Sequence, residues 1–123
     1  MKHYESKIQS YCVEWFKISY PKLALNLFAV PNGGVRSKRT AFILKREGVV
    51  SGVSDLILLV PNKNWHGLCI EMKYGANKQT ANQKAFEKAV HQVGYKYVVI
   101  RSLDEFIDTV TNYLDTKSKI LSN

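Results

Sequence analysis

The chain has 123 residues, 46% of them hydrophobic, which is enough for one compact domain with its own core. No apolar run approaches the roughly 20 residues that a membrane helix needs, and the first residues form no apolar signal segment, so we expect a soluble, cytoplasmic protein. Its 18 basic and 10 acidic residues give a formal charge of +8, and a field this basic attracts polyanions.

The first half of the chain predicts a helix, a strand and a second helix. Apolar residues at three-and-four spacing predict a helix from Glu5 to about Ser19, which Pro21 ends. The apolar run from Leu23 to Val30 predicts a strand, and the turn signal Pro31-Asn32-Gly33-Gly34 predicts a loop after it. A second helix is expected from Lys38 to Glu47.

The second half predicts a hairpin followed by a helix, a strand and a last helix. The hairpin strands are expected within Val53–Val60 and Trp65–Tyr74, on either side of a dense turn cluster. Capping-box patterns at Thr80-Ala81-Asn82-Gln83 and Ser102-Leu103-Asp104-Glu105 open the helices, and the strand Tyr95–Ile100 lies between them. The order α-β-α-β-β-α-β-α predicts an α/β fold, with a mixed sheet flanked by helices.

No repeat or low-complexity tract divides the chain, so we expect one domain over residues 1–115 and a polar tail over 116–123. Cys12 and Cys69 fall inside apolar-periodic segments, which predicts buried, reduced thiols. No glycine-rich loop of the phosphate-cradling type is present, and we expect no nucleotide cofactor.

Basic residues are concentrated in the first third of the chain, where residues 1–46 contain nine basic and two acidic residues. The densest stretch runs from Arg36 to Arg46 and has five basic residues without an acidic one. We interpret this stretch as a segment that faces phosphates. A solvated helix face explains the charge alone equally well.

Two acidic residues fall inside the predicted hairpin, where an unpaired charge is costly to bury. If the hairpin turns about residue 63, Asp55 lies opposite Glu71, and antiparallel partners have Cβ atoms roughly 4.5–5.5 Å apart. Lys73 shares a face with Glu71, because side chains two residues apart project together from a strand. Converging carboxylates suit Mg²⁺ or Mn²⁺, and a nearby Lys can orient or deprotonate an attacking water. The alternative is a salt-bridged triad with a structural role.

Two further polar residues have two interpretations each. Glu5 lies on the inward edge of the apolar stripe of the first helix, either as an extra metal or water ligand or as an acid that caps the helix start. Gln83 either reaches the hairpin acids or closes the capping box with Thr80, and the residues alone favour the capping box. Tyr95 and Tyr97 are interpreted as sheet packing.

The motif residues together resemble a known nuclease pattern. Gly52-Val53-Ser54-Asp55, followed by Glu71-Met72-Lys73, is similar to the PD-(D/E)xK motif. The accompanying features are Glu5 in an opening helix, Pro31-Asn32-Gly33-Gly34, Gln83 in a following helix and Gly94-Tyr95 before the last strand. With these features, the chain resembles the VRR-NUC family over most of its length, in the small stand-alone form known from phages and bacteria.

The resemblance implies a restriction-endonuclease-like core, αβββαβ, with the basic helix after the first strand as an addition that faces DNA. It implies that Asp55 and Glu71 bind Mg²⁺ or Mn²⁺ with help from the Met72 carbonyl, and that Lys73 handles the water. It also favours active-site roles for Glu5 and Gln83, with Glu5 as a further metal ligand. Ser51 and Ser54 stand where many relatives have proline.

The resemblance further implies a homodimer that cuts branched DNA such as a four-way (Holliday) junction. The expected DNA contacts are Asn32, Arg36, Lys38, Arg39 and Lys45. The sequence therefore predicts a divalent-metal-dependent DNA endonuclease that hydrolyses phosphodiester bonds. The alternative is a non-catalytic, basic DNA-binding module in which the acids and the lysine form a structural triad.

Overall fold

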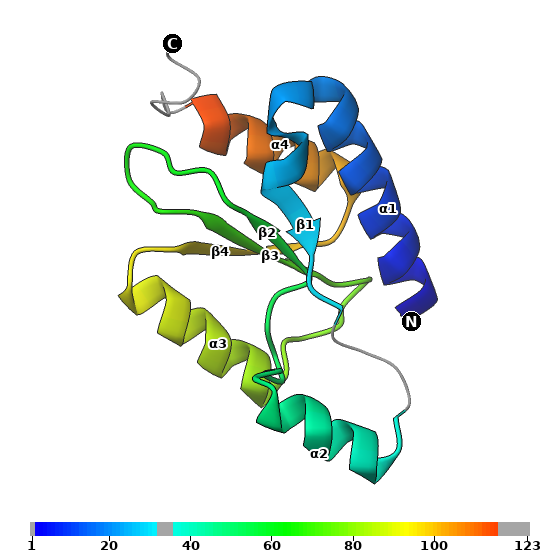
Figure 1. The fold of residues 1–123 in the computed structure, drawn as a ribbon. Coiled ribbons are helices and arrows are strands. Elements are labelled where there is room, and N and C mark those ends of the chain that lie inside the picture. The colour runs from blue at the N-terminus through cyan, green and yellow to red at the C-terminus, as the bar shows by residue number, and fades with distance from the viewer. Residues whose placement is uncertain (1, 32–35, 116–123) are drawn as a thin grey trace.

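The computed structural model describes residues 2–31 and 36–115, and a four-stranded mixed sheet lies at the centre of this part (Figure 1). Its elements are α1 (Lys2–Ser19), the 3₁₀ helix η1 (Pro21–Asn26), β1 (Leu27–Ala29), α2 (Lys38–Arg46), β2 (Leu56–Leu58), β3 (Leu68–Met72), α3 (Ala81–Gln92), β4 (Lys96–Ile100) and α4 (Leu103–Asp115). The strand order is β1-β2-β3-β4, antiparallel except for the parallel pair β3 and β4. The predicted α/β class and restriction-endonuclease-like core are confirmed, with α2 as the added helix.

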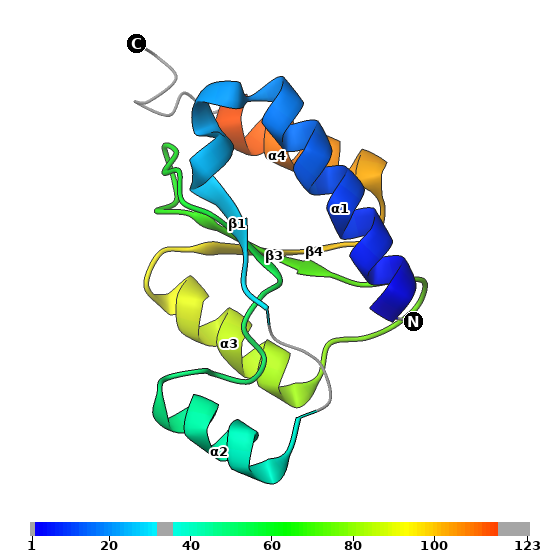
Figure 2. The ribbon, with the colours of Figure 1, turned by 45° about the vertical axis from the view of Figure 1, so that its right-hand side comes forward.

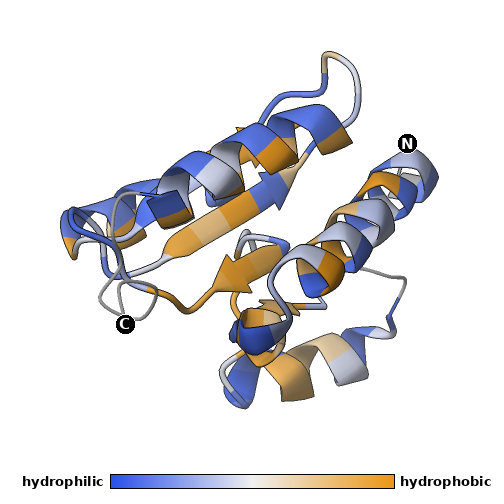
Figure 3. Cartoon of the chain, turned by 90° about the horizontal axis from the view of Figure 1, so that it is seen from above, coloured by the Kyte–Doolittle hydropathy of each residue, from blue (hydrophilic) through white to orange (hydrophobic). Residues whose placement is uncertain are grey.

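Helices cover both faces of the sheet. α1 and α4 lie on one face and α3 on the other, whereas α2 lies beyond α3 and farther from the sheet (Figures 1 and 2). The apolar strands lie between helices whose outward sides are largely hydrophilic (Figure 3). Phe16 of α1 and Phe106 of α4 are fully buried, and burying one such ring contributes about 1.5–3 kcal/mol. No helix in the two described ranges is long and apolar enough to cross a membrane.

The strand predicted from Leu23 to Val30 is wrong over its first half. Residues 21–26 form η1, and β1 begins only at Leu27. Leu23 and Leu27 are buried, but Leu25 between them is 95% exposed. A strand would place Leu25 on the same side as Leu23, so the exposure of Leu25 fits the 3₁₀ backbone and not a strand.

The hairpin of β2 and β3 is shorter than its apolar runs predict, because side-chain hydrogen bonds hold the connection between the strands. Asn62 Oδ1 accepts hydrogen bonds from the backbone N–H groups of Asn64 at 2.9 Å and Trp65 at 2.8 Å. Asn62 Nδ2 donates to the Tyr113 carbonyl at 3.0 Å, which ties the connection to α4. Asn side chains that bond the nearby backbone in this way replace the strand ladder with a turn.

The register of the hairpin is the predicted one, centred on residue 63. Leu56 pairs with Ile70, and these two positions are equally distant from that centre. Asp55 directly precedes Leu56 and Glu71 directly follows Ile70. The same register therefore brings the two acids to opposite positions at one end of the hairpin.

Side-chain caps fix the starts of α3 and α4. At α3 the predicted capping box is present: Thr80 Oγ1 accepts from the Gln83 N–H at 3.2 Å, and Gln83 Oε1 accepts from the Thr80 N–H at 2.8 Å. At α4 Ser102 Oγ accepts from the Glu105 N–H at 3.1 Å, but Glu105 Oε1 accepts from the N–H of Arg101, one residue earlier than the pattern predicts.

The loop that leads into Asp55 is pressed against the start of α3. Gly52 has a φ of +91°, and a Cβ atom at this position would lie 2.5 Å from the backbone carbon of Asn82. Asn82 Nδ2 also donates to Ser51 Oγ at 3.1 Å. The absence of a side chain at Gly52 therefore permits the close approach that sets where the loop enters β2.

Gly52→Ala should destabilise the protein more than Gly48→Ala, although both glycines have positive φ values of +91° and +103°. Such a φ costs an L residue about 1–2 kcal/mol, which is the whole effect expected at Gly48, where nothing lies within 4 Å of an added Cβ. Gly52→Ala should cost about 1–3 kcal/mol more, because the methyl group meets the Asn82 backbone. Urea unfolding measures both losses, and equal losses would contradict the close approach.

Candidate active site

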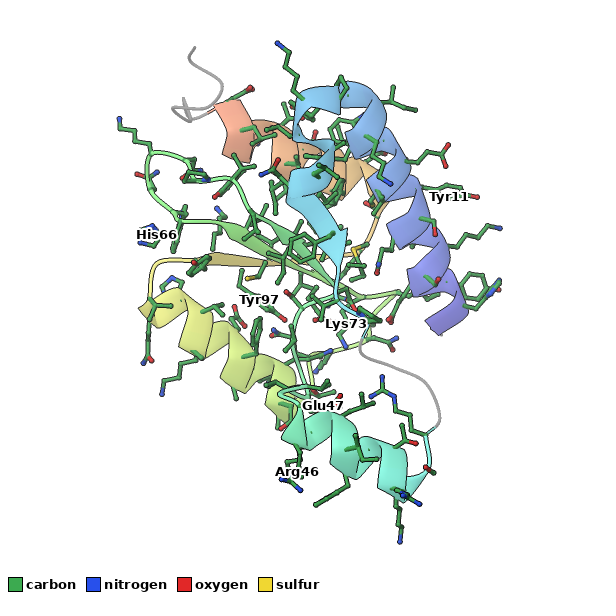
Figure 4. All side chains as sticks on the ribbon, viewed as in Figure 1. Tyr11, Arg46, Glu47, His66, Lys73 and Tyr97 are labelled. Atoms are coloured by element: carbon green, nitrogen blue, oxygen red, sulfur yellow. The ribbon has the colours of Figure 1, made fainter. Side chains whose placement is uncertain are left out.

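A cleft of about 730 Å³ lies between the first turns of α1, the loop before β2, the end of β3 and the start of α3. All five residues predicted to be catalytic line it: Glu5, Asp55, Glu71, Lys73 and Gln83. They come from four separate segments of the chain, which the sheet and α3 bring together. Lys73 at the end of β3 is labelled in Figure 4.

Glu71 is the most deeply buried acid of this cleft. It lies in β3, in which every residue is buried, and its side chain is 3% exposed. Each carboxylate oxygen accepts a hydrogen bond from a neutral group. Gln83 Nε2 donates to Oε2 at 2.9 Å, and the Tyr97 hydroxyl donates to Oε1 at 3.4 Å. The two hydrogen bonds constrain the orientation of the carboxylate.

Gln83 satisfies both of its interpretations at once. Its Oε1 closes the capping box on the Thr80 N–H, while its Nε2 donates to Glu71. The amide group has an acceptor at one end and a donor at the other, so the two hydrogen bonds do not compete. The cap of α3 is therefore also part of the candidate active site.

Asp55 lies beside Glu71, and a backbone group fixes its position. Asp55 Oδ2 accepts a hydrogen bond from the Met72 N–H at 2.7 Å. Burial, with the neighbouring Asp55 carboxylate as the second cause, raises the pKa of Glu71 to about 8, and the Lys73 ammonium opposes this shift. Lys73 is itself buried, and its backbone N–H donates to the Ile100 carbonyl at 2.9 Å.

This donor set fits a hard divalent cation. Two neighbouring carboxylates repel each other at a buried position, and a bound cation would offset that repulsion. Within residues 2–31 and 36–115, no group of three or more His, Cys, Asp or Glu side chains could hold a metal ion. A cation here would therefore rest on Asp55, Glu71 and the adjacent backbone at Met72, with water completing its shell, as Mg²⁺ prefers.

Glu5 lies on the α1 wall of the cleft, and it is bound to the segment after β3. Its Oε2 accepts hydrogen bonds of 3.4 Å from the Tyr74 N–H and from Asn77 Nδ2. Tyr4, the residue before Glu5, stacks its ring on that of Tyr74, with centroids 4.8 Å apart and planes 18° apart. Glu5 thus joins the first turns of α1 to the end of β3, and its role as a metal ligand stays a prediction.

Three contributors to this site escape sequence reasoning. For Tyr97 the sequence predicts only packing, and it gives no signal for Asn77 or for the stacked pair of Tyr4 and Tyr74. Tyr97 reaches Glu71 because β3 and β4 pair in parallel, although α3 lies between these two strands in the sequence. The spacing of residues within each strand does not indicate which residues of β3 and β4 face each other.

Two serines stabilise the loop before Asp55. The Ser54 hydroxyl is buried and donates to the Leu56 carbonyl at 3.2 Å. Ser51 Oγ accepts the hydrogen bond from Asn82. These two hydrogen bonds hold the loop that leads into Asp55.

The predicted phosphate-binding residues of α2 are exposed and adjoin the cleft. Arg36, Lys38, Arg39 and Lys45 are exposed on α2 or just before it. A groove of about 520 Å³ runs beside this helix and is lined by Arg36 and Lys45, among others. Ser51 lines both the groove and the cleft, so the two are contiguous. Asn32 lies outside the described residues.

Comparison with solved structures finds a protein of similar fold. A protein described as a "VRR_NUC domain protein" has the same fold, with a TM-score of 0.81 and 28% sequence identity. The match covers 93% of this chain and 90% of the other chain. No protein-family model matches the sequence, and no curated protein does so either.

The metal-free protein should lose stability as the pH rises from about 4.5 towards 8, and Glu71→Gln should remove much of this loss. The pKa of Glu71 is raised from 4.5 to about 8 on folding. Between these values the folded state keeps a proton that the unfolded state has released, so the free energy of unfolding falls with increasing pH.

Urea unfolding in the presence of a chelator, near both ends of this pH window, measures the effect. Glu14→Gln is the matched control, because Glu14 is an exposed acid on α1. This control should keep the pH dependence of the unmodified chain. The same dependence in Glu71→Gln would contradict the raised pKa.

Proposed function

We infer that the chain belongs to the VRR-NUC family, because its fold and its motif residues match, and from this premise we propose that it is a divalent-metal-dependent DNA endonuclease. The observation that carries the proposal is the meeting of Asp55, Glu71 and Lys73 in one cleft that neutral donors and backbone groups hold in place. Two acids and one amine are the parts that metal-assisted phosphodiester hydrolysis requires.

The proposed roles follow from this arrangement. Asp55 and Glu71 would hold Mg²⁺ or Mn²⁺, with the Met72 carbonyl as a backbone ligand. When bound, the cation supplies Lewis-acid stabilisation of phosphate charge and lowers the pKa of water. Lys73, a buried ammonium beside Glu71, would orient the attacking water. Gln83 would keep the Glu71 carboxylate oriented.

The substrate side of the proposal rests on charge and on contiguity. The formal charge of +8 and the exposed basic residues of α2 favour a polyanion. The groove beside α2 joins the cleft, so a backbone bound at α2 can continue to the acids. We propose branched DNA as the substrate and a two-fold dimer as the active form, since two copies would cut a four-way junction symmetrically.

Cleavage of labelled four-way junction, flap, duplex and single strand, in Mg²⁺, Mn²⁺ or chelator, tests this function. Asp55→Ala and Glu71→Ala should abolish cleavage and retain DNA binding, because they remove ligands and no positive charge. Lys73→Ala should slow cleavage by about 10²–10³-fold, the range for loss of one positioned donor. Paired symmetric cuts in the junction are the outcome expected of the dimer.

Glu14→Ala serves as the control, since this exposed acid lies outside the cleft. Metal-dependent cleavage that survives in Glu71→Ala would contradict the site assignment. Tight binding without cleavage in any metal, together with a melting temperature that Mg²⁺ leaves unchanged, would favour the non-catalytic DNA-binding module.

Removing basic side chains of α2 should weaken DNA binding and reduce its dependence on salt. If Arg36, Lys38, Arg39 and Lys45 each neutralise a phosphate, replacing one of them by alanine should lower the slope of log K against log salt by about one. Fluorescence anisotropy across a salt series measures the slope for each variant. Lys22→Ala, in the exposed part of η1, is the control. A slope that all four variants leave unchanged would remove α2 from the interface.

A further inference from the structure

Tyr97 is a buried phenol whose hydroxyl points at the candidate active site. It lies on β4, and Figure 4 shows it in the layer between β4 and α3. Its ring meets Phe86 of α3 edge to face, with centroids 6.3 Å apart and planes at 62°. A residue needed only for packing requires no hydroxyl there, and a buried hydroxyl without a partner is costly. The hydrogen-bond partner of the Tyr97 hydroxyl therefore indicates the role of this side chain.

That partner is Glu71. The hydroxyl lies 3.4 Å from Oε1, while the Gln83 amide lies 2.9 Å from Oε2. The two donors approach from different elements, β4 and α3, and each meets a different oxygen. A carboxylate held at both oxygens cannot rotate freely about its last bond. One lone pair on each oxygen stays available for a cation.

A second set of polar groups lies near Tyr97. The Gln79 side chain is a polar neighbour of the Tyr97 hydroxyl that opposes the rise of its pKa, and Gln79 Nε2 donates to Glu87 Oε1 of α3 at 2.9 Å. Burial raises the pKa of Tyr97 above its ordinary value, so the hydroxyl keeps its proton at neutral pH. A chain of polar interactions thus runs from Glu87 on α3 through Gln79 and Tyr97 to Glu71.

We propose that Tyr97 is a positioning residue for metal binding: its hydroxyl fixes the Glu71 carboxylate in the orientation that shares a divalent cation with Asp55. The inference rests on the proposed function, because it needs a cation at these acids. Mutating a residue that hydrogen-bonds to a metal ligand often lowers the affinity for the metal 10–100-fold. Gln79 supports the same hydroxyl and would act through it.

Binding of Mn²⁺ to the DNA-free protein, measured by electron paramagnetic resonance and by calorimetry, tests the proposal. Tyr97→Phe keeps the ring and removes the hydroxyl, so it should raise the Kd for Mn²⁺ about tenfold. The Mg²⁺ concentration for half-maximal cleavage should rise in parallel, while the rate at saturating Mg²⁺ changes little. Tyr95→Phe is the matched control, since Tyr95 packs against His66 and not against the acids. It should leave the Kd unchanged.

The outcomes distinguish failure of the proposed metal-dependent function from failure of the role of Tyr97 alone. An unmodified chain that binds no Mn²⁺ overturns the proposed function and the role of Tyr97 with it. Mn²⁺ binding that is equally tight in Tyr97→Phe, or equally weakened in Tyr95→Phe, overturns the role of Tyr97 alone. Gln79→Leu gives an independent measurement if Tyr97→Phe does not fold. It should weaken Mn²⁺ binding several-fold, and an unchanged Kd would overturn the network.

Discussion

Burying the Glu71 carboxylate in the central strand β3, beside a second carboxylate, is the constraint around which this fold is arranged. A carboxylate in such a position loses its hydration, and the charge of Asp55 adds to the penalty. Among residues 2–31 and 36–115, the side chains that donate to Glu71 are neutral, an amide and a phenol, and Lys73 is the nearby positive charge. A site built in this way keeps a deficit of positive charge that a metal ion can fill.

The topology explains how the site is assembled. The antiparallel hairpin brings Asp55 and Glu71 together through a register set over a few residues. The parallel strand β4 and the helix α3 then add the neutral donors from the other side. Acids and amine thus come from a local structure, whereas their support comes from pairing across a whole βαβ connection. The acids and the lysine therefore come from one hairpin, whereas the side chains that orient Glu71 come from α3 and β4.

This difference sets how far the sequence predicts the structure. The hairpin register about residue 63 and the cap of α3 depend on neighbouring residues, and both are as predicted. Tyr97 depends on a parallel pairing between distant segments, so its hydrogen bond to Glu71 leaves no trace in local spacing. The run from Leu23 to Val30 fails for a related reason. Packing against the core, and not hydropathy along the chain, selects a 3₁₀ helix over a strand there.

The two ends of the Gln83 amide have a consequence for which residue types this position can accept. A capping box accepts Glu as readily as Gln, because both offer the oxygen that the Thr80 N–H requires. A glutamate carboxylate has no hydrogen to donate, however, and Gln83→Glu would place a third acid beside Glu71 while the helix cap stayed intact. Helix formation alone does not distinguish the two residues, whereas the buried acid does. The electrostatic environment of Glu71, and not the cap of α3, therefore explains why position 83 has an amide and not an acid.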